Sequence, residues 1–182
     1  MGADEARAAS DPSLSQADSQ TYARVLSRLI RTMDYDLILC GKEAIDDGAS
    51  QVPTRLARIL DLPVVNFVSQ LKIANEVVQA TRDIDGGKEM VEVSLPCVLT
   101  AQKGLNEPRY PSLRHILLAK KKGIQRFTLT KLGLSPGDIA PRVQVKEYVT
   151  VPPRQGGNVL TGQVRELVSE VVRIIREEVK VL

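Results

Sequence analysis

The spacing of apolar side chains predicts alternating helices and short strands in the first part of the chain. Apolar residues recur at helical spacing over residues 21–33 and again over residues 52–60. Two short apolar runs, at 36–40 and 64–68, have the length and composition of buried strands. This αβαβ order favours a parallel sheet with helical crossovers.

The pattern then changes to extended stretches, at 69–73, 76–83 and 89–95, that are rich in alternating or β-branched residues. An Asp-Gly pair at 85–86 separates the last two stretches. Such a pair is typical of a hairpin, because glycine readily adopts a positive φ. We therefore expect an antiparallel β-meander after the αβ segments, followed by a return to the main sheet at 97–100.

The next segment predicts a short helix over residues 111–122, with an apolar face that begins at Leu113. Three lysines stand at its C-terminal end, where they complement the helix dipole. The same lysines would form a basic rim suited to an acidic partner surface. A short strand at 126–130 and an extended segment at 143–151 follow.

A proline- and glycine-rich stretch at 152–157 cannot continue a helix or a central strand, and is typical of a linker. After it, residues 162–182 carry their apolar side chains on one helical stripe. That stripe must be buried, either on the sheet of its own chain or on another chain. We therefore divide the chain into an α/β domain, 1–150, and a C-terminal arm with a helix, 151–182.

Composition narrows the function classes. The chain has 182 residues, of which 43% are hydrophobic and only 3% are aromatic, with a net charge of +3. These values are typical of a soluble globular protein, and the scarcity of aromatic residues disfavours binding of single-stranded nucleic acid. The single histidine, His115, has no second imidazole or thiol pair nearby, which argues against a metal site.

No run of apolar residues is long enough to span a membrane, and no secretory signal is visible. The two cysteines, Cys40 and Cys97, fit buried thiols in a reducing compartment, so we expect a bacterial cytoplasmic protein. No Ser/His/Asp, Cys/His or paired-carboxylate arrangement can be defended from spacing. The chain therefore resembles a binding or carrier module more than a self-sufficient enzyme.

Residues 41–52 form the most informative stretch, because they lie between a predicted strand and a predicted helix. Ligands of α/β proteins commonly bind at this end of a strand, where the helix directs free N–H groups toward them. Gly41 and Gly48 let the backbone approach a ligand closely. Ser50 and Gln51 can donate to a phosphate.

The spacing of these residues alone favours an ordinary βα connection over a nucleotide site. The stretch contains neither a Walker sequence nor a GxGxxG sequence. Asp46 and Asp47 also argue against a loop built only for phosphate, and suit a turn cap or a sugar hydroxyl. Physical reasoning therefore leaves both a structural loop and a nucleotide loop open.

Several stretches in this order resemble the beta subunit of electron transfer flavoprotein. They are GKEAIDD at 41–47, RDIDGG at 82–87, LNEPRY at 105–110, AKKK at 119–122 and PPR at 152–154. The resemblance covers nearly the whole chain. It implies an α/β, Rossmann-like fold of the adenine-nucleotide α-hydrolase type. In that fold a mostly parallel sheet carries a β-meander insertion, a C-terminal arm and a helix.

The resemblance implies an electron carrier subunit rather than a stand-alone enzyme. It would pair with an alpha subunit that holds most of the redox-active FAD, and would take electrons from acyl-CoA or related dehydrogenases. The beta subunit would bind AMP structurally. In electron-bifurcating relatives a second FAD takes the place of AMP and accepts hydride from NADH. A non-redox adenine-nucleotide-binding module is the alternative from another class.

The resemblance assigns nucleotide binding to most of the 41–52 stretch: Gly41, Lys42, Ala44, Ile45, Asp46, Asp47, Gly48, Ala49, Ser50, Gln51 and Val52. It assigns partner docking to an apolar anchor, Leu113, surrounded by Arg109, Tyr110, Lys120 and Lys121. The arm and the terminal helix would embrace the alpha subunit. No catalytic residue and no metal ligand is expected.

Two departures from the family pattern bear on the nucleotide. Val52 stands where AMP-type members often carry threonine, and Pro53 stands where glycine is common. The loss of a hydroxyl removes one phosphate donor, so AMP and a second FAD both stay open. Members also begin with further strands before the point that matches Met1. We therefore expect an N-terminally truncated chain that lacks the first strands of the sheet.

Overall fold

The computed structural model describes residues 2–153, 156–157 and 159–179. Two compact units divide the chain between Gln144 and Val145, and each unit is described by itself. Arg154 of the predicted arm and the predicted helical end at 180–182 lie outside the described residues.

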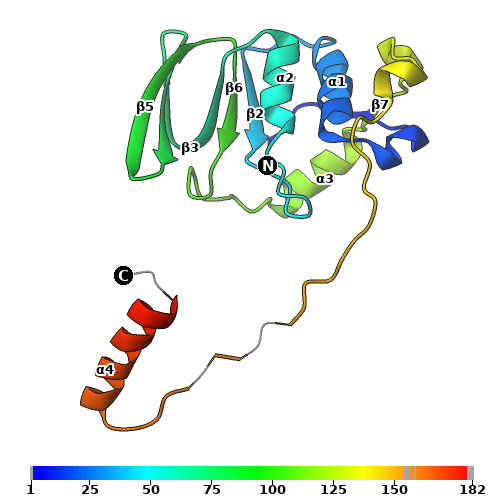
Figure 1. Cartoon of the computed structure of the whole chain (residues 1–182). Helices are drawn as coiled ribbons and strands as arrows, with labels where there is room; N and C mark the ends of the chain where they lie inside the picture. Colours follow the sequence, from blue (N-terminus) through cyan, green and yellow to red (C-terminus); the bar gives the residue numbers. More distant parts are fainter. Residues whose placement is uncertain (1, 154–155, 158, 180–182) are drawn as a thin grey trace. The chain divides into compact units, whose positions relative to one another are not determined.

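The first unit contains a five-stranded sheet of order β2-β6-β3-β4-β5 (Figure 1). Strands β2 (Leu37–Gly41), β6 (Cys97–Ala101) and β3 (Val64–Ala74) run parallel to one another. Strands β4 (Val77–Ile84) and β5 (Gly87–Ser94) continue the sheet in antiparallel order. The mixed α/β class and the β-meander are confirmed, as is the return of the chain to the parallel strands in β6.

Strand β3 belongs to both halves of the sheet, so the two strands predicted at 64–68 and 69–73 are one strand. A register shift interrupts it near Phe67, whose φ of 62° marks the bend. The Phe67 N–H donates to the buried Thr100 hydroxyl at 2.8 Å, so the irregular backbone keeps a hydrogen-bond partner. This bulge lets β3 leave β6 and form the hairpin with β4.

Helices α1 (Ser19–Ile30) and α2 (Val52–Leu60) pack against each other and on one face of the parallel strands (Figure 1). Their contact with the sheet buries Leu56 of α2 against Ile38 and Val98. The predicted helices are confirmed, with α1 beginning and ending slightly earlier than predicted. The opposite face carries a second cluster that includes Val65, Val68, Val78 and Leu99.

A third apolar cluster joins α1 to the segment after the sheet. Val25 and Leu29 pack against Leu129, Leu132 and Ile139. These partners lie in or beside two 3₁₀ turns, Thr130–Leu132 and Pro136–Ile139. A further 3₁₀ turn, Pro12–Gln16, precedes α1.

Strand β1 (Arg7–Ala9) pairs in parallel with β7 (Gln125–Phe127), and sequence reasoning missed it. No strand is predicted before residues 36–40, since residues 8–20 are rich in Ser, Asp, Ala and Gln. The partner of β1 is far along the chain, so only the tertiary fold creates the pairing. The strand predicted at 126–130 is also shorter than expected, because a 3₁₀ turn begins at Thr130.

The later elements also differ from the predictions at their ends. Helix α3 is Leu113–Lys121, and Ser112 caps it by accepting from the His115 N–H, so the predicted start at Pro111 is wrong. No strand forms over 143–151, which lacks a neighbouring strand among the described residues. In the second unit, helix α4 (Val164–Ile174) continues as a π-helical turn, Ile175–Val179.

Asp18 joins the start of α1 to the end of the first unit. One carboxylate oxygen accepts from the Thr21 N–H at 2.8 Å, and the other accepts from the N–H groups of Arg142 (2.7 Å) and Val143 (3.2 Å). Partial burial alone would raise the pKa of Asp18, but these donors together lower it to about 2. The charged carboxylate therefore caps a helix and anchors the segment that leads to the arm.

We predict that Leu99→Ala lowers the free energy of unfolding by about 2–4 kcal/mol, because it removes a fully buried side chain from β6, the middle one of the three parallel strands. Leu39→Ala is the matched control: Leu39 pairs with Leu99 in register but lies on the edge strand and is 58% exposed. Its cost should stay below about 1 kcal/mol. Urea denaturation of both variants measures the difference, and equal losses would contradict this account of the core.

We predict that Asp18→Ala lowers the free energy of unfolding by about 1–2 kcal/mol at neutral pH, since it removes a helix cap. The folded pKa lies below the unfolded value, so this contribution is present above about pH 4 and is lost as the pH falls toward 2. Denaturation from pH 7 to pH 3 should therefore narrow the difference in unfolding free energy between variant and wild type to about half.

Asp11→Ala is the control for this prediction, because Asp11 accepts only from Ser13 within its own turn. It should cost clearly less than Asp18→Ala. A gap between wild type and Asp18→Ala that widened in acid would show that the charge is not what stabilises this junction.

Candidate functional site

A pocket of about 350 Å³ opens where strand β2 ends and helix α2 begins. Its walls come from the end of β2, the following loop, the first turn of α2 and one side of α1. The lining residues are Ser19, Leu26, Cys40, Gly41, Lys42, Glu43, Ala44, Asp47, Ala49, Ser50, Gln51, Val52 and Pro53. The pocket thus lies at the carboxyl end of a parallel strand, where α/β sheets bind ligands.

Most residues predicted to bind a nucleotide meet in this pocket: Gly41, Lys42, Ala44, Asp47, Ala49, Ser50, Gln51 and Val52. Ile45, Asp46 and Gly48 do not line it. The Ile45 side chain is fully exposed, and Gly48 occupies a turn with a φ of 56°. The loop therefore folds so that its middle lies on the surface while its two ends form the pocket wall.

Both aspartates cap a turn, which is one of the two roles that the sequence left open for one of them. Asp47 accepts from the Ala49 N–H, and Asp46 accepts from the Asp47 N–H, both at 3.0 Å. The Gly48 N–H also donates to the Ala44 carbonyl at 3.0 Å. These local bonds stabilise the turn at the middle of the loop.

Sequence reasoning left Glu43 out of the binding set, although it lies inside the same stretch. Its carboxylate pairs with Lys42 Nζ at 2.8 Å and accepts from the Ser50 hydroxyl at 2.8 Å. The hydrogen bonds from Lys42 and then Ser50 hold the pKa of Glu43 below its usual range. The two side chains that best suit an anion therefore already contact an anion.

Helix α2 begins at the pocket without a side-chain cap. Gln51 presents its amide oxygen to Arg55 at 2.8 Å, and Arg55 also donates to Gln20 of α1 at 2.8 Å. The Gln51 amide nitrogen is thus the end that can donate to a ligand. Pro53 has no N–H, so Val52 and Thr54 supply the free backbone donors of the first turn.

Two α1 residues, Ser19 and Leu26, complete the pocket and were also missed. Leu26 belongs to the apolar stripe that predicted the helix, yet it is 37% exposed. The sequence does not show which residue of an apolar stripe a helix leaves uncovered. The place of Leu26 in the pocket wall therefore could not be predicted before the packing of α1 was known.

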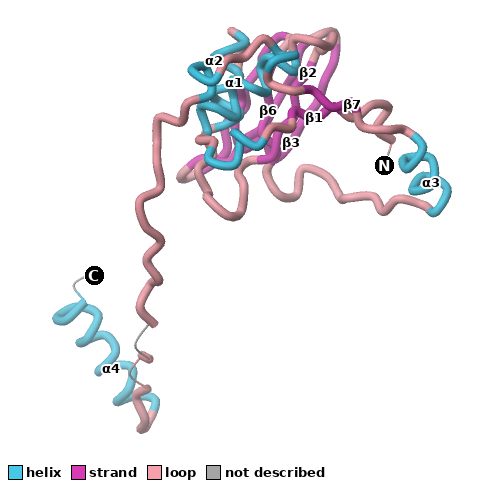
Figure 2. The backbone as a smooth tube through the Cα atoms, turned by 90° about the vertical axis from the view of Figure 1, so that its right-hand side faces the viewer, coloured by secondary structure: helices cyan, strands magenta, loops and turns pink. Residues whose placement is uncertain are grey.

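The residues predicted to dock a partner lie in and before α3, which has no buried residue. Leu113 is 79% exposed and Tyr110 is 97% exposed. Lys120 and Lys121 stand in the last turn, and Arg109 precedes the helix on the exposed connection. Figure 2 shows α3 at the tip of a long connection that projects from the sheet.

The lysine run does not act as one group. Lys122 donates to the Ala3 carbonyl at 2.8 Å and lies 3.6 Å from the Asp4 carboxylate. It therefore ties the end of the helix to the N-terminal segment. Lys120 and Lys121 form no ion pair with any described residue, so their charges are available at the surface of α3.

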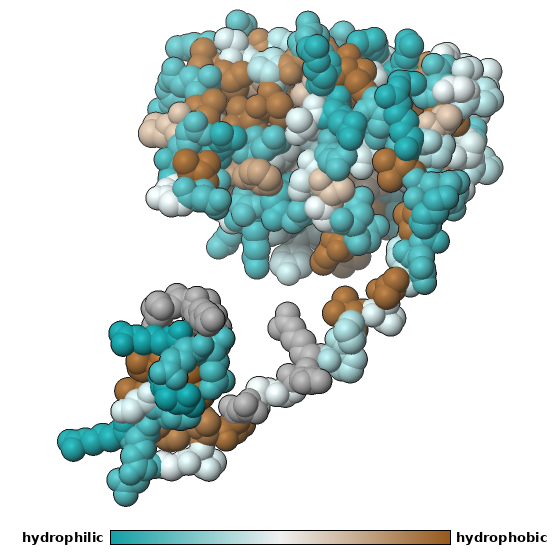
Figure 3. All heavy atoms as spheres, viewed as in Figure 1, coloured by the Kyte–Doolittle hydropathy of each residue, from teal (hydrophilic) through white to brown (hydrophobic). Residues whose placement is uncertain are grey.

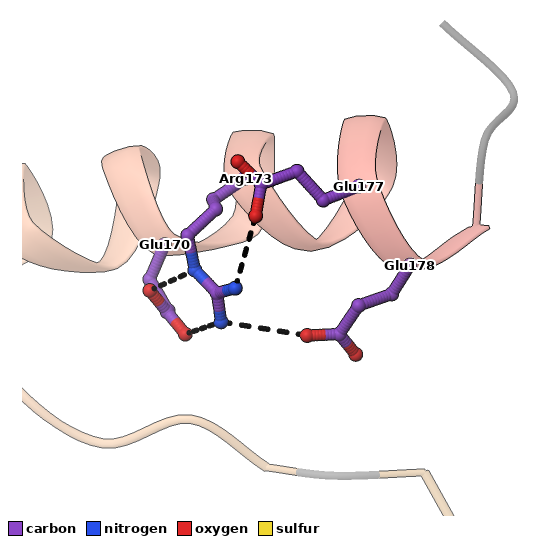
Figure 4. A network of polar contacts seen from close by, with 4 residues as sticks. All are labelled: Glu170, Arg173, Glu177 and Glu178. Atoms are coloured by element: carbon purple, nitrogen blue, oxygen red, sulfur yellow. Dashed lines mark hydrogen bonds and ion pairs between the residues drawn. The ribbon is translucent and has the colours of Figure 1, made fainter.

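Helix α4 has one charged face and one apolar face. On the charged face, Arg173 contacts Glu170 at 2.7 Å, Glu177 at 3.3 Å and Glu178 at 3.4 Å (Figure 4). The large apolar side chains of α4 that are exposed are Val164, Val168, Val171 and Val172. Figure 3 shows hydrophobic side chains at the surface of this helix. Within the described residues no helix is long and apolar enough to cross a membrane, and no cluster of potential metal ligands occurs.

Comparison with known proteins identifies the family of this fold and pocket. The family model described as the electron transfer flavoprotein domain matches residues 1–132. The electron transfer flavoprotein subunit beta of Bacillus subtilis is 38% identical across the whole chain, which covers 71% of that relative. The chain therefore belongs to the electron transfer flavoprotein family and groups with its beta subunits.

Two further relatives agree with this assignment. The electron transfer flavoprotein subunit beta of Thermoanaerobacterium thermosaccharolyticum is 34% identical over 94% of this chain and 68% of its own. Subunit CarD of the caffeyl-CoA reductase-Etf complex of Acetobacterium woodii is 36% identical over 98% of this chain and 70% of its own. The family resemblance found in the sequence is thereby confirmed.

Proposed function

We propose that this chain is an electron carrier subunit that binds AMP and pairs with an alpha subunit holding FAD. Together they carry electrons from acyl-CoA or related dehydrogenases to an acceptor. The observation that carries this proposal is the pocket formed by residues 41–52 at the end of β2. The chain belongs to a family of flavoproteins, and this pocket has the hydrogen-bond donors and the apolar walls that a mononucleotide requires.

The pocket chemistry suits AMP in each of its parts. Leu26 and Val52 offer apolar contacts for a base, and Asp47 offers a carboxylate for a ribose hydroxyl. Lys42, Ser50 and the N-terminus of α2 offer donors for a phosphate. At about 350 Å³ the pocket is near the lower end of small-molecule sites, which favours a mononucleotide over a second FAD.

We infer a Rossmann-like architecture of the adenine-nucleotide α-hydrolase type for the first unit. The parallel strands β2, β6 and β3, with α1 and α2 on one face, support this inference. FAD supplies the redox chemistry when it is bound with the alpha subunit. The role of this chain is to hold the nucleotide and to present docking surfaces.

Two exposed apolar helices supply those surfaces. In α4 the apolar face carries four exposed valines, and covering such a face with the alpha subunit would remove it from water. In α3 the apolar Leu113 stands beside basic residues, a pattern that suits a short-lived dock on an acidic partner. Neither helix buries a side chain within its own unit.

The deciding experiment is co-expression with an electron transfer flavoprotein alpha subunit, followed by chromatography of the released nucleotides. We expect a yellow complex with equimolar FAD and AMP. Two FAD and no AMP per complex would contradict AMP binding and indicate the electron-bifurcating type, in which a second FAD takes the place of AMP. A colourless complex or a colourless chain with AMP would favour the non-redox nucleotide module, and the absence of any complex would overturn the carrier proposal.

We predict that Leu113→Ala slows dehydrogenase-coupled flavin reduction by about tenfold, which corresponds to the loss of one anchor side chain. Heterodimer formation and nucleotide content should not change, because α3 buries no side chain and does not line the pocket. Stopped-flow reduction measures the rate. Ile84→Ala, an exposed apolar change on β4, is the control, and an equal effect of both variants would remove Leu113 from the docking surface.

A further inference from the structure

Glu43 is a carboxylate placed where the proposed pocket needs positive charge. One of its oxygens lies 2.8 Å from Lys42 Nζ and the other 2.8 Å from the Ser50 hydroxyl. Lys42 and Ser50 are also the side-chain donors that a phosphate would use. All three residues line the same pocket.

We propose that Glu43 sets the charge selectivity of this pocket, so that it favours the adenine nucleotide with the least phosphate charge. The proposal rests on the nucleotide-binding function proposed above. An entering phosphate must share Lys42 and Ser50 with the Glu43 carboxylate, and it lies close to that negative charge. The repulsion grows with the charge of the ligand, so ATP is penalised more than ADP, and ADP more than AMP.

The surrounding contacts hold Glu43 in this position. Both carboxylate oxygens are engaged, and its side chain is only 34% exposed. Ser50 has a φ of 51°, and its hydroxyl is directed at Glu43 by the hydrogen bond between them. The bonds from Gly48 to Ala44 and from Ala49 to Asp47 stiffen the loop between these contacts. The carboxylate therefore stays in the pocket wall when a ligand enters.

The other charges around the pocket do not cancel this effect. Asp47 is the second carboxylate of the lining, and it adds to the repulsion. Arg55 directs its guanidinium toward Gln51 and Gln20. Lys42 is thus the one cation among the lining residues, and it is already paired with Glu43.

The test is calorimetric titration of the full 182-residue chain, freed of nucleotide, with adenosine, AMP, ADP and ATP. Glu43→Gln keeps an oxygen that can accept from Ser50 but removes the charge. We expect it to tighten AMP about threefold and ATP about tenfold or more, while adenosine is unchanged. The gain should shrink at high ionic strength, because salt screens exposed charges.

Glu92→Gln is the matched control, since Glu92 also accepts a hydrogen bond, from Gln79 at 2.7 Å, but lies on the edge strand farthest from β2. It should change none of the four affinities. An equal or weaker affinity of Glu43→Gln for AMP and ATP would overturn this inference alone, with wild-type binding of AMP retained. If neither the wild type nor Glu43→Gln binds AMP, the nucleotide function and this inference are overturned together.

Discussion

The parallel pairing of β6 with β2 on one side and β3 on the other determines where the functional segments lie. In this register Gly41 at the end of β2 stands beside Ala101 at the end of β6, which also pairs with Val68 of β3. The loop that forms the pocket and the connection that leads to α3 therefore both leave the sheet at the carboxyl end of the parallel strands. A pairing shifted by one residue would turn the side chains of β6 to the wrong faces and empty both clusters.

Helix α1 connects this end of the sheet with the last residues of the first unit. Leu26 forms part of the pocket wall, and the Gln20 side chain accepts a hydrogen bond from the Arg55 guanidinium of α2. At its N-terminus Asp18 fixes the backbone of Arg142 and Val143, directly before the second unit begins. One helix thus forms part of the pocket wall and holds the segment that leads to the arm, although neither contact is visible in its amphipathic pattern.

Local sequence signals predicted the elements whose cause is local. The strand, loop and helix around residues 41–52 followed from an apolar run, glycines and a helical stripe. The pairing of β1 with Gln125–Phe127 did not, because only the finished fold brings these segments together. Glu43 was missed for a related reason, since its contact with Ser50 depends on how the loop turns back. The start of α3 also lies later than the predicted residue 111, because Ser112 acts as the N-cap.

The two edges of the sheet differ in how they are protected. Edge strand β5 carries Lys88, Glu89 and Glu92, charges that discourage pairing with another strand. Edge strand β2 consists of Leu-Ile-Leu-Cys-Gly and has no charged side chain. Its free backbone groups and the exposed Leu39 therefore form a template for strand addition. A further strand approaching β2 would thus meet no charged side chain of that strand, whereas one approaching β5 would meet three.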